Sequence, residues 1–215
     1  MSVICPTITA FSEDDYKKQM DSIVHVAHRV HIDLTDGSFA PTQTVAPKQA
    51  WWPVGFAADF HLMFKQPLPA IQELLEHKPN LIIVHAEAEG NYKDVADLCH
   101  QQGVKIGVAL LAGTTAEHIV PALDHTDHVL IFSGNLGHQG GSIADLSLLD
   151  KVKMLKSLKP QLEIGWDGGV NDQNVVELIN GGVEVLDVGG YIQHAQDPAR
   201  AFNALQRIAD ETGTT

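Results

Sequence analysis

The segment HIDLTDGSF, residues 31–39, places a histidine and an aspartate two positions apart in an apolar run. Alternate residues of a strand point to the same side, so His31 and Asp33 are expected to share one face. Imidazole and carboxylate together suit borderline divalent metals such as zinc, iron(II), manganese or cobalt. Two groups do not complete such a site, and other elements of the chain must supply the rest.

Short β-branched runs alternate along the chain with stretches of helical spacing, which is typical of parallel strands joined by crossover helices. Eight strands are predicted, at residues 3–9, 29–34, 58–64, 81–87, 105–111, 128–133, 162–167 and 184–189. Candidate helix caps are Ser12, Asn91, Thr115, Asn171 and Asp197. Glycines at 103, 181 and 182 stand where helices should end.

Eight strand and helix units with no Pro/Gly/Ser-rich linker between them predict one domain over residues 1–215, a (β/α)8 TIM barrel. An open doubly wound sheet is the alternative. That fold normally has a Gly-rich phosphate turn after its first strand, and the segment TITAFSED contains no glycine.

The amino-acid composition limits the ligands, partners and location that are expected for the protein. The formal net charge of −13 disfavours nucleic acids and anionic membranes as partners, so any anionic ligand must be captured locally. Cys5 and Cys99 form no C-x-x-C pattern and are expected to be reduced thiols. The amino terminus lacks signal-peptide features and no segment has the length of a membrane span, so a cytoplasmic location is expected.

The reactive groups of a (β/α)8 barrel lie at the carboxyl ends of its strands. Those positions carry His31 and Asp33 on the second strand, His61 on the third and Asp167 on the seventh. One histidine in a strand is more often a hydrogen-bonded core residue than a ligand. Four such groups at predicted strand ends favour a site for one divalent metal, which can polarise a sugar carbonyl.

Glycines follow strands six, seven and eight, in the segments GNLGHQGGS, DGGV and VGGY. Barrel enzymes commonly bind phosphate after strands seven and eight, where backbone N–H groups approach the anion. The candidate phosphate residues are Gly140, Gly141, Gly168, Gly169, Gly189 and Gly190.

Over almost its whole length the sequence resembles the ribulose-phosphate 3-epimerase family. HIDLTDGSFAPT is similar to the family segment H-x-D-x-M-D-G-x-F-x-P-N, and VKIGVALLAGTTAE is similar to G-V-A-L-N-P-x-T-P-x-E. HLM, VHAEA and DGGV correspond to its third, fourth and seventh strands. The resemblance implies a barrel of the ribulose-phosphate-binding type and a homo-oligomer, a dimer or larger.

The resemblance also implies roles for individual residues. His31, Asp33, His61 and Asp167 would hold the metal, and Asp33 and Asp167 would act as the acid/base pair on opposite sides of a phosphorylated ketose. One carboxylate would remove the C3 proton, and the other would return a proton to the opposite face of a cis-enediolate. Thr7 and Met63 join the glycines as substrate-binding residues. Independently of the resemblance, His85 and Glu87 alternate on strand four, so they either line the barrel mouth or orient the metal ligands, and the second role is favoured.

Several positions depart from the family pattern. Thr7 replaces the serine of strand one, Thr35 replaces a methionine and is expected to make the site more polar, and Phe132 replaces another methionine. The clamp M-S-V-N-P-G-F-G-G-Q is FSGNLGHQGG here, with Leu136 and His138 in place of proline and phenylalanine.

The predicted function is a metal-dependent epimerase that interconverts ribulose 5-phosphate and xylulose 5-phosphate. The changed clamp keeps a ketohexose 6-phosphate such as allulose 6-phosphate as an alternative substrate. A barrel that binds a sugar phosphate without catalysis is a second alternative. A decarboxylase ranks last, because the Asp-x-Lys-x-x-Asp array of related barrels is missing.

Overall fold

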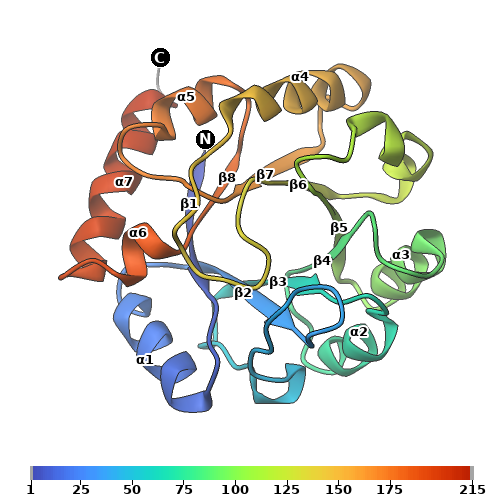
Figure 1. Cartoon of the computed structure of the whole chain (residues 1–215), viewed down its shortest axis with the longest axis horizontal. Helices are drawn as coiled ribbons and strands as arrows, with labels where there is room; N and C mark the ends of the chain where they lie inside the picture. The colour runs from blue at the N-terminus through green and yellow to red at the C-terminus, as the bar shows by residue number, and fades with distance from the viewer. Residues whose placement is uncertain (1, 214–215) are drawn as a thin grey trace.

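A computed structural model describes residues 2–213 and shows eight parallel strands that close into a barrel in sequence order (Figure 1). The strands are β1 Val3–Ile8, β2 Arg29–Thr35, β3 Ala57–Met63, β4 Leu81–His85, β5 Lys105–Leu110, β6 His128–Phe132, β7 Glu163–Asp167 and β8 Val185–Val188. β1 pairs with β8, which closes the barrel. The predicted (β/α)8 TIM barrel is therefore confirmed.

Helices surround the strands, as Figure 1 shows. They are α1 Glu13–Ile23, α2 Leu68–Leu75, α3 Tyr92–Gln101, α4 Leu149–Leu158, α5 Val175–Asn180, α6 Gly190–Gln193 and α7 Pro198–Thr212. Short 3-10 helices are η1 Pro47–Gln49, η2 Ala116–His125 and η3 Leu146–Leu148. Among the described residues, no helix is long and apolar enough to cross a membrane.

Two connections differ from the predicted strand–helix repeat. Between β2 and β3 the described chain forms only the short η1, and between β5 and β6 it forms the 3-10 helix η2. Pro121 lies inside η2 and has no N–H to donate to a regular helical ladder. The barrel closes without an α-helix at these places because every strand pairs with a neighbouring strand on both sides.

The predicted caps are confirmed at three of the five positions. The side chains of Ser12, Asn91 and Asp197 accept hydrogen bonds from the first turns of α1, α3 and α7. Thr115 precedes η2 without a side-chain cap bond. Asn171 is wrong as a cap, because its Oδ1 accepts from Gln173 N in a turn and α5 begins only at Val175.

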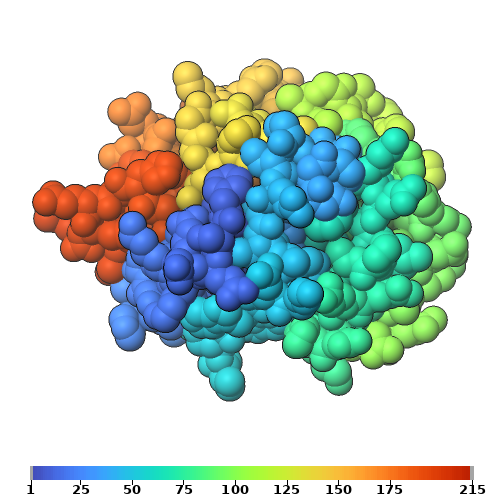
Figure 2. All heavy atoms as spheres, turned by 60° about the horizontal axis from the view of Figure 1, so that its bottom comes forward, coloured from blue at the N-terminus to red at the C-terminus, as the bar shows by residue number. Residues whose placement is uncertain are grey.

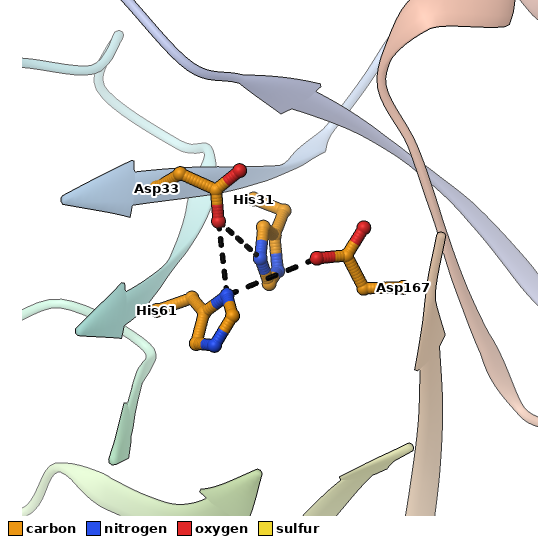
Figure 3. A group of neighbouring side chains, drawn as sticks. All are labelled: His31, Asp33, His61 and Asp167. Carbon is orange, nitrogen blue, oxygen red and sulfur yellow. Dashed lines mark hydrogen bonds and ion pairs between the residues drawn. The ribbon is translucent and has the colours of Figure 1, made fainter. Parts of the chain in front are cut away.

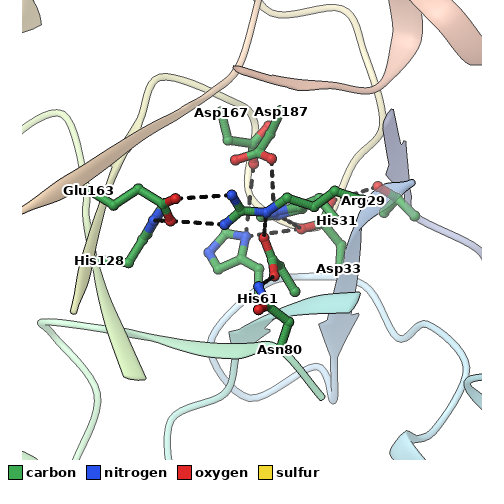
Figure 4. A network of polar contacts seen from close by, with 11 residues as sticks. Arg29, His31, Asp33, His61, Asn80, His128, Glu163, Asp167 and Asp187 are labelled. Atoms are coloured by element: carbon green, nitrogen blue, oxygen red, sulfur yellow. Dashed lines mark hydrogen bonds and ion pairs between the residues drawn. The ribbon is translucent and has the colours of Figure 1, made fainter. Parts of the chain in front are cut away.

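The core has two parts. Most buried apolar side chains lie between the strands and the surrounding helices and form one large cluster. A smaller cluster of Leu81, Ile83, Ala109 and Leu130, from β4, β5 and β6, packs separately from it. Histidines and charged residues of β2, β3, β6, β7 and β8 gather inside the barrel, as Figure 4 shows. This arrangement brings the ionisable groups of distant strands together.

Candidate active site and metal centre

His31 and Asp33 extend from β2 toward the same space, as the two-residue spacing predicts (Figure 3). His31 Nε2 lies 3.2 Å from Asp33 Oδ1. Both side chains are buried, and Thr9 Oγ1 donates to Asp33 Oδ2 at 2.7 Å. The hydroxyl fixes one carboxylate oxygen, so the other is directed to the histidines.

His61 on β3 and Asp167 on β7 complete the group. His61 Nδ1 lies 2.9 Å from Asp33 Oδ1 and 3.8 Å from Asp167 Oδ2. Each of the four residues offers one ligand atom, and these four atoms lie within 4.8 Å of one another. The structure thus brings together all four side chains that the sequence predicts as metal ligands.

The electrostatics of the two carboxyl groups are opposite. Burial raises the pKa of Asp33, but the neighbouring imidazoles of His31 and His61 outweigh it and hold the pKa well below its usual range. Burial, reinforced by the charge of Asp33, raises the pKa of Asp167 well above its usual value. Two carboxyl groups of unequal proton affinity suit a site where one accepts a proton and the other supplies one.

The two imidazoles also differ. Burial lowers the pKa of His61 to about 4, which favours the neutral ring that coordinates metals. His31 is buried too, but Asp187 and Asp33 outweigh burial and raise its pKa well above 6.5. When no metal ion is bound, protonated His31 supplies the positive charge that Asp187 and Asp33 attract.

The donor set fits a divalent cation. Two imidazole nitrogens and two carboxylate oxygens match the preferences of zinc, iron(II), manganese and cobalt. Within the described chain, His31 Nε2 has no hydrogen-bond partner although it is fully buried beside Asp33. A bound cation would satisfy that nitrogen.

A cavity of about 250 Å³ opens above this group. Asp33 and Asp167 line it, together with all eight residues predicted to bind substrate: Thr7, Met63, Gly140, Gly141, Gly168, Gly169, Gly189 and Gly190. Thr7 Oγ1 is buried and, among the described residues, has no hydrogen-bond partner. The hydroxyl is therefore available to a ligand in the cavity.

The paired glycines allow two loops to meet at the rim of the cavity. Gly168 has φ +117°, and a Cβ there would lie 2.2 Å from Gly134 N. A Cβ on Gly169 would lie 2.1 Å from Ala144 N. Only glycine fits at these positions, so the end of β7 can pack directly on the loop that follows β6.

The connection between β6 and α4 lies across the mouth of the barrel in Figure 1. Gln139 Nε2 donates to the Thr7 carbonyl at 2.9 Å, and Gly137 N lies 3.2 Å from Met63 Sδ. Thr42 Oγ1 donates to the Gly137 carbonyl at 2.6 Å, and Figure 2 shows this yellow segment against the blue loop after β2. The segment 132–141, which differs from the family clamp, is thus held over the cavity.

The expectation that Thr35 makes the site more polar is wrong. Its hydroxyl donates to the Thr42 carbonyl at 2.6 Å, and Thr35 is not among the residues that line the cavity. The hydroxyl stabilises the loop after β2 instead.

Behind His61, the pair His85 and Glu87 lies as predicted for ligand-orienting residues. His85 Nε2 is 2.9 Å from His61 Nε2, and His85 Nδ1 is 3.5 Å from Glu87 Oε2. Thr114 Oγ1 donates to Glu87, which connects the series to the loop after β5.

Sequence reasoning missed Asp187 on β8, which is buried and lines the floor of the cavity. No motif surrounds it in EVLDVG. The two-residue period of a strand would have found it, because Asp187 shares a face with the predicted Gly189.

The fold and the site define a (β/α)8-barrel protein whose His/Asp cluster, at the floor of a glycine-rimmed cavity, is compatible with metal binding. Residues 3–193 match the model of the ribulose-phosphate 3 epimerase family. The chain belongs to this family, whose members named below are epimerases, a class of isomerase.

Relatives with assigned names agree with this placement. The chain is 29% identical over 211 residues to ribulose-phosphate 3-epimerase of Helicobacter pylori strain J99, covering 95% of this chain and 97% of that protein. It is 32% identical over 185 residues to ribulose-phosphate 3-epimerase of Bacillus subtilis, covering 82% and 85%.

Solved structures agree on the fold. The protein named KGPDC from Streptococcus mutans aligns with a TM-score of 0.75 at 13% identity, covering 99% of each chain. A 3-hexulose-6-phosphate synthase aligns with a TM-score of 0.71 at 18% identity, covering 96% of this chain and 99% of that one.

Proposed function

We propose that this protein inverts the configuration at C3 of a phosphorylated ketose, with ribulose 5-phosphate and xylulose 5-phosphate as the substrate pair. The observation that carries the proposal is the placement of Asp33 and Asp167 on strands β2 and β7, at the floor of one cavity together with two imidazoles. The names of the relatives agree with this substrate.

In the proposed reaction, Asp33 and Asp167 approach C3 from opposite faces. One carboxylate accepts the C3 proton, and the other carboxyl group delivers a proton to the opposite face. Because each group ends with the protonation state that the other began with, the same pair serves the reverse reaction. Thr9 keeps Asp33 in place through its 2.7 Å hydrogen bond.

His31, His61, Asp33 and Asp167 would hold one divalent metal ion, with zinc, iron(II), manganese and cobalt as candidates. When bound, such an ion neutralises the negative charge that develops on the sugar oxygens as the proton leaves. His85 supports this arrangement through its 2.9 Å contact with His61 Nε2.

The phosphate would bind at the glycine-rich rim. Among the described residues that line the cavity there is no lysine or arginine, so backbone N–H groups and hydroxyls must supply the donors. Thr7, with its unpartnered Oγ1, is the hydroxyl placed for this role. Capture by backbone groups explains how a chain of net charge −13 binds an anion.

A ketohexose 6-phosphate is the second candidate substrate, and one observation favours it. A second hollow of about 630 Å³ shares Thr9, His138, Gln139 and His194 with the first cavity. A longer sugar phosphate would extend there through a movement of the shared side chains, such as Gln139, that separate the two hollows.

Exchange of the C3 hydrogen with deuterated water tests the proposal. Purified, metal-quantified protein is incubated with ketopentose and ketohexose phosphates, and deuterium incorporation is followed by NMR. We expect metal-dependent exchange that is lost in Asp33→Asn, and the substrate that exchanges fastest identifies the sugar. Absence of exchange on every substrate at full metal occupancy would contradict an epimerase and favour a non-catalytic sugar-phosphate-binding barrel.

Two further attributes belong to the proposal. We expect a homo-oligomer, a dimer or larger, which light scattering measures directly, and a cytoplasmic enzyme, which fractionation of the source cell tests.

A further inference from the structure

Asp187 lies in β8, and its side chain lies beside Asp167 and is directed toward His31 (Figure 4). In the sheet it is paired with Cys5 of β1 and Asp167 of β7. Its side chain is 1% exposed, and within the described chain neither carboxylate oxygen has a hydrogen-bond partner. A carboxylate in this state costs free energy unless it serves another group.

Asp187 faces the imidazole of His31. Asp187 Oδ1 lies 3.3 Å from His31 Nδ1, while Nε2 of the same ring lies 3.2 Å from Asp33 Oδ1 on the cavity side. The imidazole therefore bridges two carboxylates with its two nitrogens. The 3.3 Å separation of Nδ1 from Asp187 Oδ1 is close to hydrogen-bond distance.

The imidazole of His61 faces the site with its other nitrogen. His61 turns Nδ1 toward Asp33 and Asp167, and its Nε2 is backed by His85 Nε2 at 2.9 Å. The two histidines thus offer opposite nitrogens to the same point. A neutral histidine can offer the lone pair of one ring nitrogen only if the other ring nitrogen carries the proton. That N–H group then needs an acceptor on the side of the ring away from the metal site.

We propose that Asp187 is a positioning residue that accepts a hydrogen bond from His31 Nδ1–H and so fixes the tautomer whose Nε2 lone pair faces the metal. The inference rests on the metal site of the proposed function. The carboxylate also makes the imidazole a stronger donor, because it stabilises the positive charge that coordination places on the ring.

A purely structural role does not account for Asp187. Asp59, another buried aspartate of the barrel, has Arg29 Nε at 2.5 Å and Asn80 Nδ2 at 2.6 Å. Asp187 has no such partner among the described residues, and its charge raises the pKa of Asp167. The stability of the barrel would be served better by an apolar residue of similar size.

The test compares zinc binding by the full-length parent, Asp187→Asn and the control Cys5→Ala. Cys5 is buried beside Asp187 in the sheet, so Cys5→Ala disturbs the same layer without removing the partner of His31. Dissociation constants are measured by competition with a chromophoric chelator, without any sugar present. We expect a loss of about 10- to 100-fold in Asp187→Asn and little change in Cys5→Ala.

A second readout needs no variant. In the zinc-loaded parent labelled with ¹⁵N histidine, long-range NMR correlations should show His31 protonated at Nδ1 and His61 protonated at Nε2. Protonation of His31 at Nε2, or an unchanged affinity in Asp187→Asn, would overturn the role of Asp187. Failure of the parent to bind zinc would overturn the metal site itself, so the two outcomes are distinguishable.

Discussion

Two clusters of polar side chains share the barrel interior and differ in how completely their charges are paired. The lower cluster, nearer the N-terminal ends of the strands, is Arg29, Asp59, His128 and Glu163. The upper cluster, nearer their C-terminal ends, is His31, Asp33, His61 and Asp167, and Figure 4 shows both clusters. Each contains two carboxyl groups and at least one histidine. Only the lower cluster contains an arginine.

In the lower cluster every carboxylate oxygen has a partner. Arg29 donates from Nε to Asp59 at 2.5 Å and from its two terminal nitrogens to Glu163 at 3.0 and 2.9 Å. Asn80 Nδ2 donates to the other Asp59 oxygen at 2.6 Å, and His128 Nδ1 lies 2.8 Å from the Glu163 oxygen that also accepts from Arg29. A planar guanidinium satisfies both acids at once, so the carboxylates of this cluster are paired without a ligand, while His128 Nε2 has no described hydrogen-bond partner.

The upper cluster lacks such a cation. Its fully buried His31 Nε2 has no described hydrogen-bond partner, and burial together with the charge of Asp33 raises the pKa of Asp167. The comparison shows two uses of buried ionisable groups. Carboxylates that pair with a cation of the protein stabilise the fold, and carboxylates without such a cation are available to bind a ligand.

The largest expected effect concerns the acid/base pair. Asp33→Asn or Asp167→Asn should lower the rate of C3 epimerisation by about 10²- to 10⁴-fold, because an amide cannot take up or deliver the proton. Steady-state turnover measures the loss, and circular dichroism should show a folded barrel. Turnover close to that of the parent in either variant would refute the assigned role.

The next effect is on stability and involves the lower cluster. Arg29→Met leaves Asp59 and Glu163 buried without their cation and should reduce the free energy of unfolding by about 3–5 kcal/mol. Lys93→Met is the matched control, because it breaks the exposed pair Lys93–Asp97 and should leave the free energy of unfolding almost unchanged. Urea denaturation compares the two, and equal losses would contradict the distinction.

A smaller effect is the pH dependence of stability. Burial would raise the pKa of Glu163, but hydrogen bonds from His128 and Arg29 outweigh it and hold the pKa well below 4.5. The unfolded chain binds this proton at higher pH, so the stabilisation is present above about pH 4.5 and lost as the pH falls below it.

Glu163→Gln should therefore be less stable at neutral pH and show a shallower decline between pH 4.5 and more acidic conditions. Denaturant titrations at a series of pH values measure both changes. A decline in the variant as steep as in the parent would show that Glu163 does not carry this dependence.

The smallest expected effect is at the shared wall of the two hollows. His194 and His138 line both, so His194→Ala should raise KM for a phosphorylated ketose several-fold with kcat nearly unchanged. A fall in kcat with constant KM would place His194 in the chemistry instead.

Much of the upper cluster was predictable from the sequence, because strand period and strand-end position place His31, Asp33, His61 and Asp167 together in any (β/α)8 barrel. The lower cluster was not, because Arg29, His128 and Glu163 stand at the N-terminal ends of their strands, where no rule about reactive groups applies, and they meet only through the register of a closed barrel. The role of Thr35 was also beyond the sequence, since its hydroxyl partner lies seven residues away in an irregular loop.

The measurement that tests the central claim most directly is titration of metal-free protein with zinc or manganese by calorimetry. The account predicts one ion per chain, lost in the double variant His61→Asn, Asp167→Asn and retained in the control Lys93→Met. No binding by the parent, or equal binding by the double variant, would contradict the claim that the upper cluster is completed by a divalent cation.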